Sequence, residues 1–206
     1  MAKLFLTGES KVAFSEAVRT VEAASSAELV VAVRQRSGSY VHVNLTVGIL
    51  VGLVALAFLL YSPSSHELIW FLVDPVVAGA VAGLVFLRSP LLTRIITRRA
   101  ARRGRVETAA RSVFVEQRVH STSGRTGILL YLSLLEREAV LVVDLAVEAL
   151  AGSDAWRAAV TEIESAMRGG ASGLEVAAKV SGLAAVLGPV LPCGENDVDE
   201  LPNEVC

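Results

Sequence analysis

The chain has 206 residues, of which 53% are hydrophobic and 19% are charged, and its mean hydropathy is +0.56. This composition is too apolar for an ordinary water-soluble domain, and the formal net charge of −2 hides a very uneven distribution of charge along the chain. Cys193 and Cys206 are too few and too close to the C-terminus for a disulfide framework or a zinc site.

The first segment predicts a helix followed by a strand. Apolar residues recur at helical spacing over residues 13–24, where Phe14, Val18 and Val21 share one face. Two serines interrupt this pattern, and the apolar run at 28–33 predicts a short strand.

Two long apolar stretches follow, at residues 43–61 and 68–87. Each is about as long as the ~20 residues that cross a bilayer as a helix. Only the short segment 62–67 separates them. The sequence therefore predicts a transmembrane hairpin inserted between two soluble segments.

The distribution of arginine predicts the orientation of this hairpin. The linker between the spans has no Lys or Arg, Arg34 and Arg36 precede the first span, and a dense basic segment follows the second. By the positive-inside rule we expect a multi-pass protein of the inner membrane with both termini cytoplasmic and His66 outside. The arginines that follow the second span are Arg88, Arg94, Arg98, Arg99, Arg102, Arg103 and Arg105.

We interpret this basic segment as juxtamembrane, fixing the topology and touching the anionic lipid of the inner leaflet. A nucleic-acid patch is the less favoured interpretation, because no aromatic residue lies between Arg88 and Arg111 to stack on bases.

Small residues inside the spans indicate how the two helices pack. Gly48 and Gly52 in the first span, and Gly79 and Gly83 in the second, are spaced so that helix backbones can approach closely. Asp74 is the only ionisable residue inside either span, and Pro75 follows it. We favour a helix-start cap beside a proline kink for Asp74, with a role in a substrate or proton pathway as the alternative.

The second soluble segment predicts helices alternating with strands. A helical pattern covers 91–117, a polar turn follows at 120–124, and the apolar runs at 127–133 and 138–144 predict a strand pair. Strands this continuously apolar are buried on both faces, so we expect helices on both sides of the sheet.

Two further helices are predicted at 155–168 and 173–187, separated by Gly169 and Gly170, and the acidic tail after Pro192 is expected to be extended. The fold class is therefore α/β.

No motif in the chain identifies a reaction or a cofactor. The phosphate-binding loop, the dinucleotide-binding glycine motif, the zinc-protease motif and the nucleophile elbow are all absent from the sequence. Asp144 is a weak catalytic candidate at the end of a strand, where an Asp is more often a turn former or helix cap. Arg125 is a second one: it could orient an anion, or it could be a surface charge or a partner of Glu136.

Several segments occur in an order that resembles the bacterial membrane-bound branch of the TPM domain family. That family is named for a thylakoid lumen protein, a photosystem II repair protein and a nematode receptor modulator. The segments are residues 26–33, 36–40 and 120–127, Glu136, Asp144, and residues 197–202.

The resemblance implies a small α/β/α sandwich split by the transmembrane hairpin. The implied division has a first part of the sandwich at 1–41, the hairpin at 42–88, the second part at 89–192, and an acidic tail at 193–206.

The resemblance also bears on function. Some plant members of the family are acid phosphatases that bind calcium or other metals, whereas bacterial members are often membrane-tethered and encoded beside LemA-type membrane proteins. Phosphatase-type members carry an acidic residue before the glycine that opens the second strand, where this chain has Arg125 and Thr126 before Gly127. The family pattern Asp-x-Gly-Ile reads here as Asp144 followed by Leu, Ala and Val, without its glycine.

We therefore expect an interaction or scaffold module for another membrane protein, of the LemA type or a second copy, with no cofactor. The alternative is a metal-assisted phosphatase in which Asp144 is the ligand or nucleophile and Arg125 orients the phosphate. Transport by the hairpin is the least favoured hypothesis, because two short spans with one acidic residue need many copies to form a pore.

Overall fold

The computed structural model describes residues 5–63, 67–150 and 152–193. The chain forms two compact units: Met1–Ser37 together with Arg103–Cys206, and Gly38–Arg102. The predicted boundaries after residues 41 and 88 differ from these, since residues 89–102 belong with the apolar helices. The predicted tail lies outside the described residues apart from Cys193, as does His66.

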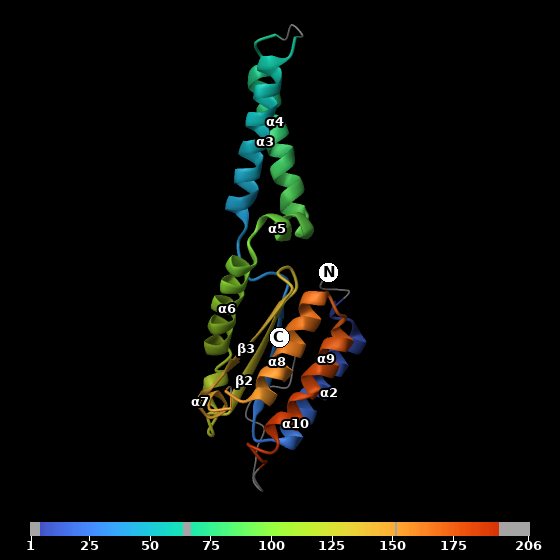
Figure 1. Ribbon diagram of the computed structural model, residues 1–206, viewed down its shortest axis with the longest axis vertical. Coiled ribbons are helices and arrows are strands. Elements are labelled where there is room, and N and C mark those ends of the chain that lie inside the picture. Colours follow the sequence, from blue (N-terminus) through green and yellow to red (C-terminus); the bar gives the residue numbers. More distant parts are fainter. Residues whose placement is uncertain (1–4, 64–66, 151, 194–206) are drawn as a thin grey trace. The chain divides into compact units, whose positions relative to one another are not determined.

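The first unit is built on a three-stranded mixed sheet in the order β1-β2-β3 (Figure 1). Strand β1 (Glu28–Arg34) pairs in parallel with β2 (Gly127–Ser133), so that Glu28 lies opposite Gly127. Strand β3 (Glu138–Val143) pairs antiparallel with β2. All three predicted strands are confirmed, with small differences at their ends.

Helices cover both faces of this sheet, as predicted. Side chains alternate between the faces of a strand, so Leu29 and Val31 point one way and Val30 and Ala32 the other. The first pair belongs to a large core with α2 (Gly8–Ala24), α8 (Asp154–Gly169), α9 (Gly173–Ser181) and α10 (Leu183–Leu187). The second pair packs in a smaller core with Val106, Ala110 and Val113 of α6 (Arg99–Glu116).

Two predicted helices are each divided in the structure. The pattern at 91–117 forms α5 (Pro90–Ile96) and α6, because Nη1 of Arg102 donates to the carbonyl oxygens of Arg94, at 2.6 Å, and of Thr97. These bonds satisfy carbonyls that a continuous helix would have paired internally. The pattern at 173–187 forms α9 and α10, which are separated at Gly182.

The first helix is longer than predicted, and the polar turn is partly helical. Helix α2 begins at Gly8 because the side chain of Thr7 accepts a hydrogen bond from the backbone N–H of Ser10 at 3.2 Å. A 3-10 turn, η1 (Val119–Ser121), occupies the first part of the predicted turn, and the short helix α7 (Leu145–Glu148) follows β3.

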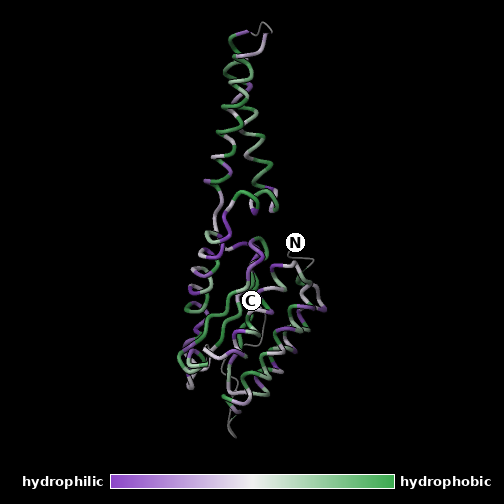
Figure 2. The backbone as a smooth tube through the Cα atoms, viewed as in Figure 1, coloured by the Kyte–Doolittle hydropathy of each residue, from purple (hydrophilic) through white to green (hydrophobic). Residues whose placement is uncertain are grey.

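The second unit contains α3 (Val41–Tyr61) and α4 (Trp70–Arg88), close to the two predicted spans. Both helices are long and apolar enough to cross a membrane, and Figure 2 shows hydrophobic residues along most of their length. Large apolar side chains such as Leu50, Val54 and Leu72 are exposed on them. The two helices lie side by side (Figure 1).

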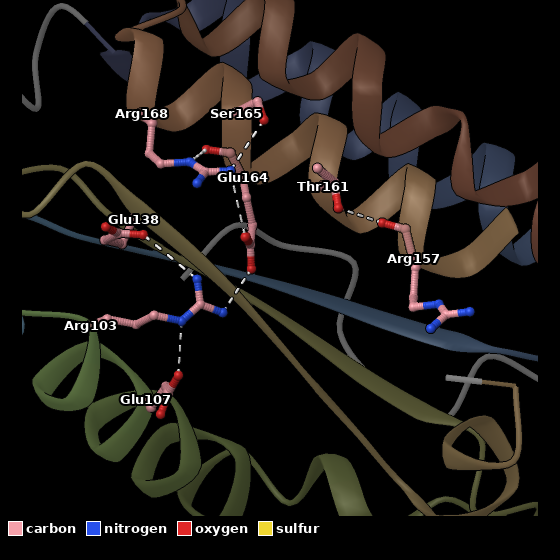
Figure 3. A network of polar contacts seen from close by, with 8 residues as sticks. All are labelled: Arg103, Glu107, Glu138, Arg157, Thr161, Glu164, Ser165 and Arg168. Carbon is pink, nitrogen blue, oxygen red and sulfur yellow. Dashed lines mark hydrogen bonds and ion pairs between the residues drawn. The ribbon is translucent and has the colours of Figure 1, made fainter. Parts of the chain in front are cut away.

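Arg103 lies near the start of α6 and connects α6, α8 and β3 at the β3 edge of the sheet (Figure 3). Arg103 donates to Glu107 on α6 at 3.0 Å and to Glu164 on α8 at 2.9 Å. Its Nη1 lies 3.9 Å from Oε2 of the buried Glu138 at the start of β3. Arg103 thus ties a helix on one face of the sheet to a helix on the other.

The position of Arg103 differs from the sequence interpretation, which placed it among the lipid-facing arginines. Its guanidinium instead contacts carboxylates of the α/β unit. The hydrogen bond to Glu164 is the main cause that raises the pKa of Arg103 above its already high ordinary value. Its positive charge is therefore constant over any pH range in which the protein would be studied.

We expect Arg103→Met to lower the free energy of unfolding of the α/β unit by about 1–2 kcal/mol, since a partly exposed cation shared by several carboxylates is lost. The matched control is Arg157→Met, because within the described part of the chain Arg157 forms its ion pair with the exposed Asp154 on its own helix, and such pairs contribute about 0.5 kcal/mol or less. Urea unfolding of the detergent-solubilised protein, followed by circular dichroism, measures both. Equal losses in the two variants would contradict a connecting role for Arg103.

Candidate functional site

The two apolar helices meet through glycine backbones. A Cβ atom on Gly79 would lie 2.6 Å from the carbonyl oxygen of Gly48, and one on Gly48 would lie 2.8 Å from that of Gly79. A Cβ on Gly52 would lie 2.8 Å from the carbonyl oxygen of Pro75. Real Cβ atoms do not approach oxygen so closely, so only glycine permits this contact at all three positions.

Gly83, the fourth predicted glycine, lies in the same contact but is less constrained. A Cβ there would be 3.4 Å from the carbonyl oxygen of Asn44, which is an ordinary contact distance. The structure thus brings all four predicted glycines together between α3 and α4, with different tolerance for a side chain.

An apolar groove of about 630 Å³ runs along the helix pair beside this contact. The glycines form part of its lining, and leucine, isoleucine and valine side chains of both helices form the rest. On α3 the lining extends from Val41 to Leu56, about 22 Å at the rise of 1.5 Å per residue. The lining residues are Val41, Asn44, Leu45, Gly48, Ile49, Gly52, Leu53, Leu56, Pro75, Val76, Gly79, Ala80, Gly83, Leu84 and Leu87.

Asn44 is the groove residue that sequence reasoning missed. It has the one polar side chain among the described residues that line the groove, it is buried, and its Oδ1 has no hydrogen-bond partner in the described part of the chain. A buried amide oxygen without a donor is costly in an apolar environment. The available signal was a lone amide near the start of an otherwise apolar stretch.

Asp74 does not cap α4, in contrast to the favoured interpretation. The N-cap position is Ile69, and Asp74 lies inside the helix, half-buried and directly before Pro75. The helix starts far enough before Asp74 that its first turn is already complete at that point. Its pathway role remains a prediction.

Asp144 and Arg125 lie close together in the α/β unit, at the point where β3 ends. Oδ1 of Asp144 accepts a hydrogen bond from the backbone N–H of Leu145 at 2.8 Å, so Asp144 is the N-cap of α7. Oδ2 of Asp144 is buried and lies 3.7 Å from Nη1 of Arg125, and the same nitrogen donates to the carbonyl oxygen of His120 at 2.8 Å. Arg125 forms an ion pair with Asp144, whereas one alternative predicted a pair with Glu136.

This corner does not suit a divalent metal ion. A metal site needs several oxygen, nitrogen or sulfur ligands around one point, and in the described part of the chain no three His, Cys, Asp or Glu side chains are grouped in that way. The oxygen of Asp144 that is not used in capping faces the cation of Arg125 instead. The capping role that the sequence favoured for Asp144 is confirmed.

A second missed cluster lies at the other end of the strands. Glu136 is buried in the turn between β2 and β3, and it accepts a hydrogen bond from the backbone N–H of Ser37 at 3.1 Å. The hydroxyl of Ser37 donates to Oγ of Ser133 at 2.7 Å and lies 3.1 Å from the hydroxyl of Tyr131. Two segments that were separate pieces of the family resemblance are therefore bonded to each other.

The remaining arginines of the basic segment are spread over several elements. Arg88 is the last residue of α4, Arg94 lies in α5, Arg98 lies between α5 and α6, and Arg99 begins α6. Arg105 is on α6 within the α/β unit. Arg102 holds the end of α5, as described above.

We expect Gly79→Ala to weaken the α3–α4 contact by about 1–3 kcal/mol, because the new methyl group overlaps the carbonyl of Gly48. The matched control is Gly83→Ala, whose methyl group fits at ordinary contact distance and should have little effect. Thermal unfolding in mild detergent, followed by helical circular dichroism, measures the difference. Equal stability of the two variants would contradict the contact.

Comparison with known proteins supports the fold. No family model matches the chain, and no curated protein matches it. The solved structures include a similar one, the NMR structure of the BA42 protein from the psychrophilic bacterium Bizionia argentinensis, with a TM-score of 0.59 and 17% sequence identity over 100% of this chain and 98% of that one. At this identity the likeness shows the fold alone, a mixed arrangement of helices with a small sheet.

Proposed function

We propose that this protein is a membrane-anchored interaction module whose α3–α4 pair crosses the inner membrane and receives a helix of another membrane protein. The observation that carries the proposal is the apolar groove with its glycine lining, on helices that expose large apolar side chains to their surroundings. In water such a surface would aggregate, whereas in a bilayer it is matched to lipid and to neighbouring helices.

Membrane insertion is supported by the length and apolarity of both helices and by the placement of charge. The arginines after α4 have no counterpart in the linker between the helices, which by the positive-inside rule supports a cytoplasmic α/β unit. We further propose that the α/β unit is a TPM-type sandwich interrupted by this hairpin. The helices on both faces of a three-stranded sheet support that assignment.

The groove fits a helix because it is lined almost entirely by apolar residues and extends along α3 from Val41 to Leu56. The glycines are used in the contact between α3 and α4, whereas the small side chain of Ala80 is exposed along the groove. Van der Waals packing is the main attraction between helices in lipid. Asn44 adds the one polar side chain among the described residues that line the groove, which favours one position of an incoming helix along it. The partner expected first is a LemA-type membrane protein, with a second copy of this chain as the alternative.

The rival function, a metal-assisted phosphatase, gains no support from its proposed residues. Asp144 is used as a helix cap and its other oxygen faces Arg125. We therefore propose no catalytic role for Asp144 and Arg125.

The proposed topology makes a direct labelling prediction. A membrane-impermeant maleimide added to intact spheroplasts should label Glu67→Cys, in a background with Cys193→Ser and Cys206→Ser, because the linker is outside. The exposed Cys193 of the unaltered chain should react only after the membrane is disrupted. Labelling of Cys193 in intact spheroplasts would show the opposite orientation.

The proposed docking of a partner helix in the groove is tested by a substitution that fills the groove. Ala80 is exposed and lines the groove, whereas Ala57 is exposed and is not among its lining residues. We expect Ala80→Leu to reduce co-purification of a co-expressed, tagged LemA-type protein by about tenfold, the effect of about 1.4 kcal/mol of overpacking, and Ala57→Leu to leave it unchanged. A differently tagged second copy is the parallel probe for self-association. If neither probe co-purifies with the unaltered chain, or if both variants behave alike, the groove is not the docking site.

A further inference from the structure

Helix α5 exposes apolar side chains and buries threonines, which is the opposite of the pattern in a helix of a water-soluble domain. Leu91, Ile95 and Ile96 are 60%, 78% and 47% exposed. Two threonines of the same segment, Thr93 and Thr97, are only 4% and 9% exposed. A helix packed on a soluble core shows the reverse pattern, with its apolar residues buried and its hydroxyl groups in water.

The buried hydroxyl of Thr93 makes a hydrogen bond within its own helix, so its burial leaves no donor unpaired. It donates to the carbonyl oxygen of Ser89, one turn earlier, at 3.2 Å. Leu91 and Ile95 are four residues apart and therefore lie on the same face of the helix. The exposed apolar face is thus continuous and is not a single stray side chain.

The charge around α5 is of one sign. Arg88, Arg94 and Arg98 lie before, within and directly after the helix, and the sequence has no Asp or Glu between Pro75 and Val106. A helix with an apolar face and a cationic border is the type that lies in the plane of a membrane surface and attracts anionic lipid.

The position of α5 in the chain points to the same surface. Helix α4 ends at Arg88, Ser89 has an extended backbone, and Pro90 opens α5 at the position where proline suits a helix start. A short helix that begins two residues after a membrane span emerges at the surface of the bilayer. Arg102, in the same unit, satisfies the carbonyls of Arg94 and Thr97 at its end, which matters where water is scarce.

We propose that α5 lies within the headgroup layer of the inner leaflet, with Leu91 and Ile95 directed toward the acyl chains and Arg94 and Arg98 toward anionic headgroups. This inference rests on the proposed membrane insertion of α3 and α4. It goes further in assigning α5 as a second, lateral contact with lipid. The ligand is the anionic membrane surface and not another protein.

The test uses the full chain with Cys193→Ser and Cys206→Ser, carrying a single environment-sensitive fluorophore and reconstituted in vesicles of phosphatidylcholine and phosphatidylglycerol. The label is placed at Ile95→Cys, at Leu50→Cys in the middle of α3, and at Val115→Cys, an exposed apolar position on the part of α6 within the α/β unit. Nitroxide-bearing lipids measure how closely each label approaches the bilayer.

We expect the label at Ile95 to shift to shorter wavelength and to be quenched by nitroxides near the headgroup. The label at Leu50 should be quenched by nitroxides deep in the acyl chains, and the label at Val115 should not be quenched. If Ile95 behaves like Val115 while Leu50 is quenched, the α5 inference is overturned and the membrane anchor stands. If Leu50 is not quenched either, the proposed membrane insertion fails as well.

The lipid charge is tested with the double variant Arg94→Gln and Arg98→Gln, in the chain labelled at Ile95. Its matched control is Arg111→Gln, which alters an exposed arginine of α6 outside this segment. We expect the blue shift at Ile95 to be larger in anionic than in purely zwitterionic vesicles, and this difference to be lost in the double variant only. An equal shift in both kinds of vesicle for the unaltered arginines would overturn the assignment of anionic headgroups.

Discussion

The parallel pairing of β1 with β2 is the constraint on which the rest of the structure depends. Two parallel neighbours require the chain to leave one end of the sheet and return to the other end, normally through a helix. Here α6 is that returning helix, but the chain first passes through α3, α4 and α5. Since α6 brings the chain back along the sheet to the start of β2, α6 begins at the end of the sheet where β1 finished. The long inserted segment therefore leaves and re-enters the α/β unit at that same end.

Two glutamates of one turn hold both ends of this insertion. Glu136 binds the backbone of Ser37, where the insertion begins, and Glu138 faces Arg103, where the chain has returned. Between them Arg137 has a φ of 52°, a conformation uncommon for a residue with a side chain. Glu136 and Glu138 are both buried, so each is held among fixed neighbours and not on a free surface. The turn between β2 and β3 and the first residue of β3 thus contact both points at which the inserted segment leaves and re-enters the α/β unit.

The elements that could be predicted are those with a strong local pattern. The apolar strands and the two long helices were predicted from composition and periodicity to within a few residues. Strands buried on two faces, and helices able to cross a bilayer, have apolar residues at nearly every position. The break between α5 and α6 was missed because no glycine or proline marks it at residues 97 and 98. Gly104 is the obvious breaker in that stretch, yet it lies inside α6, and the break depends on where Arg102 bonds. At Gly182 the signal for a break was present and was overlooked.

The site was harder to predict than the fold, for a similar reason. The four glycines could be found because helix packing in lipid selects small residues at a fixed spacing. The contact between Glu136 and Ser37 could not be predicted, because it joins residues 99 positions apart and no motif around either residue indicates it. The role of Asp144 could not be predicted from its position alone. A carboxylate at the end of a strand has the same local sequence pattern whether it caps a helix or binds a ligand. Its contacts with Leu145 and Arg125 distinguish the two roles.

The arginines of the basic segment divide into two groups by the kind of interaction they need. Orientation in a membrane depends on the number of positive charges near the end of a span, and lysine serves as well as arginine there. Arg103 depends on geometry instead, because its Nε and Nη2 atoms donate to two carboxylates that lie in different directions. A lysine has the same charge but one nitrogen, and cannot reach these acceptors together. In the proposed topology the sum of this charge therefore orients the hairpin, whereas a single side chain, Arg103, connects elements within the α/β unit.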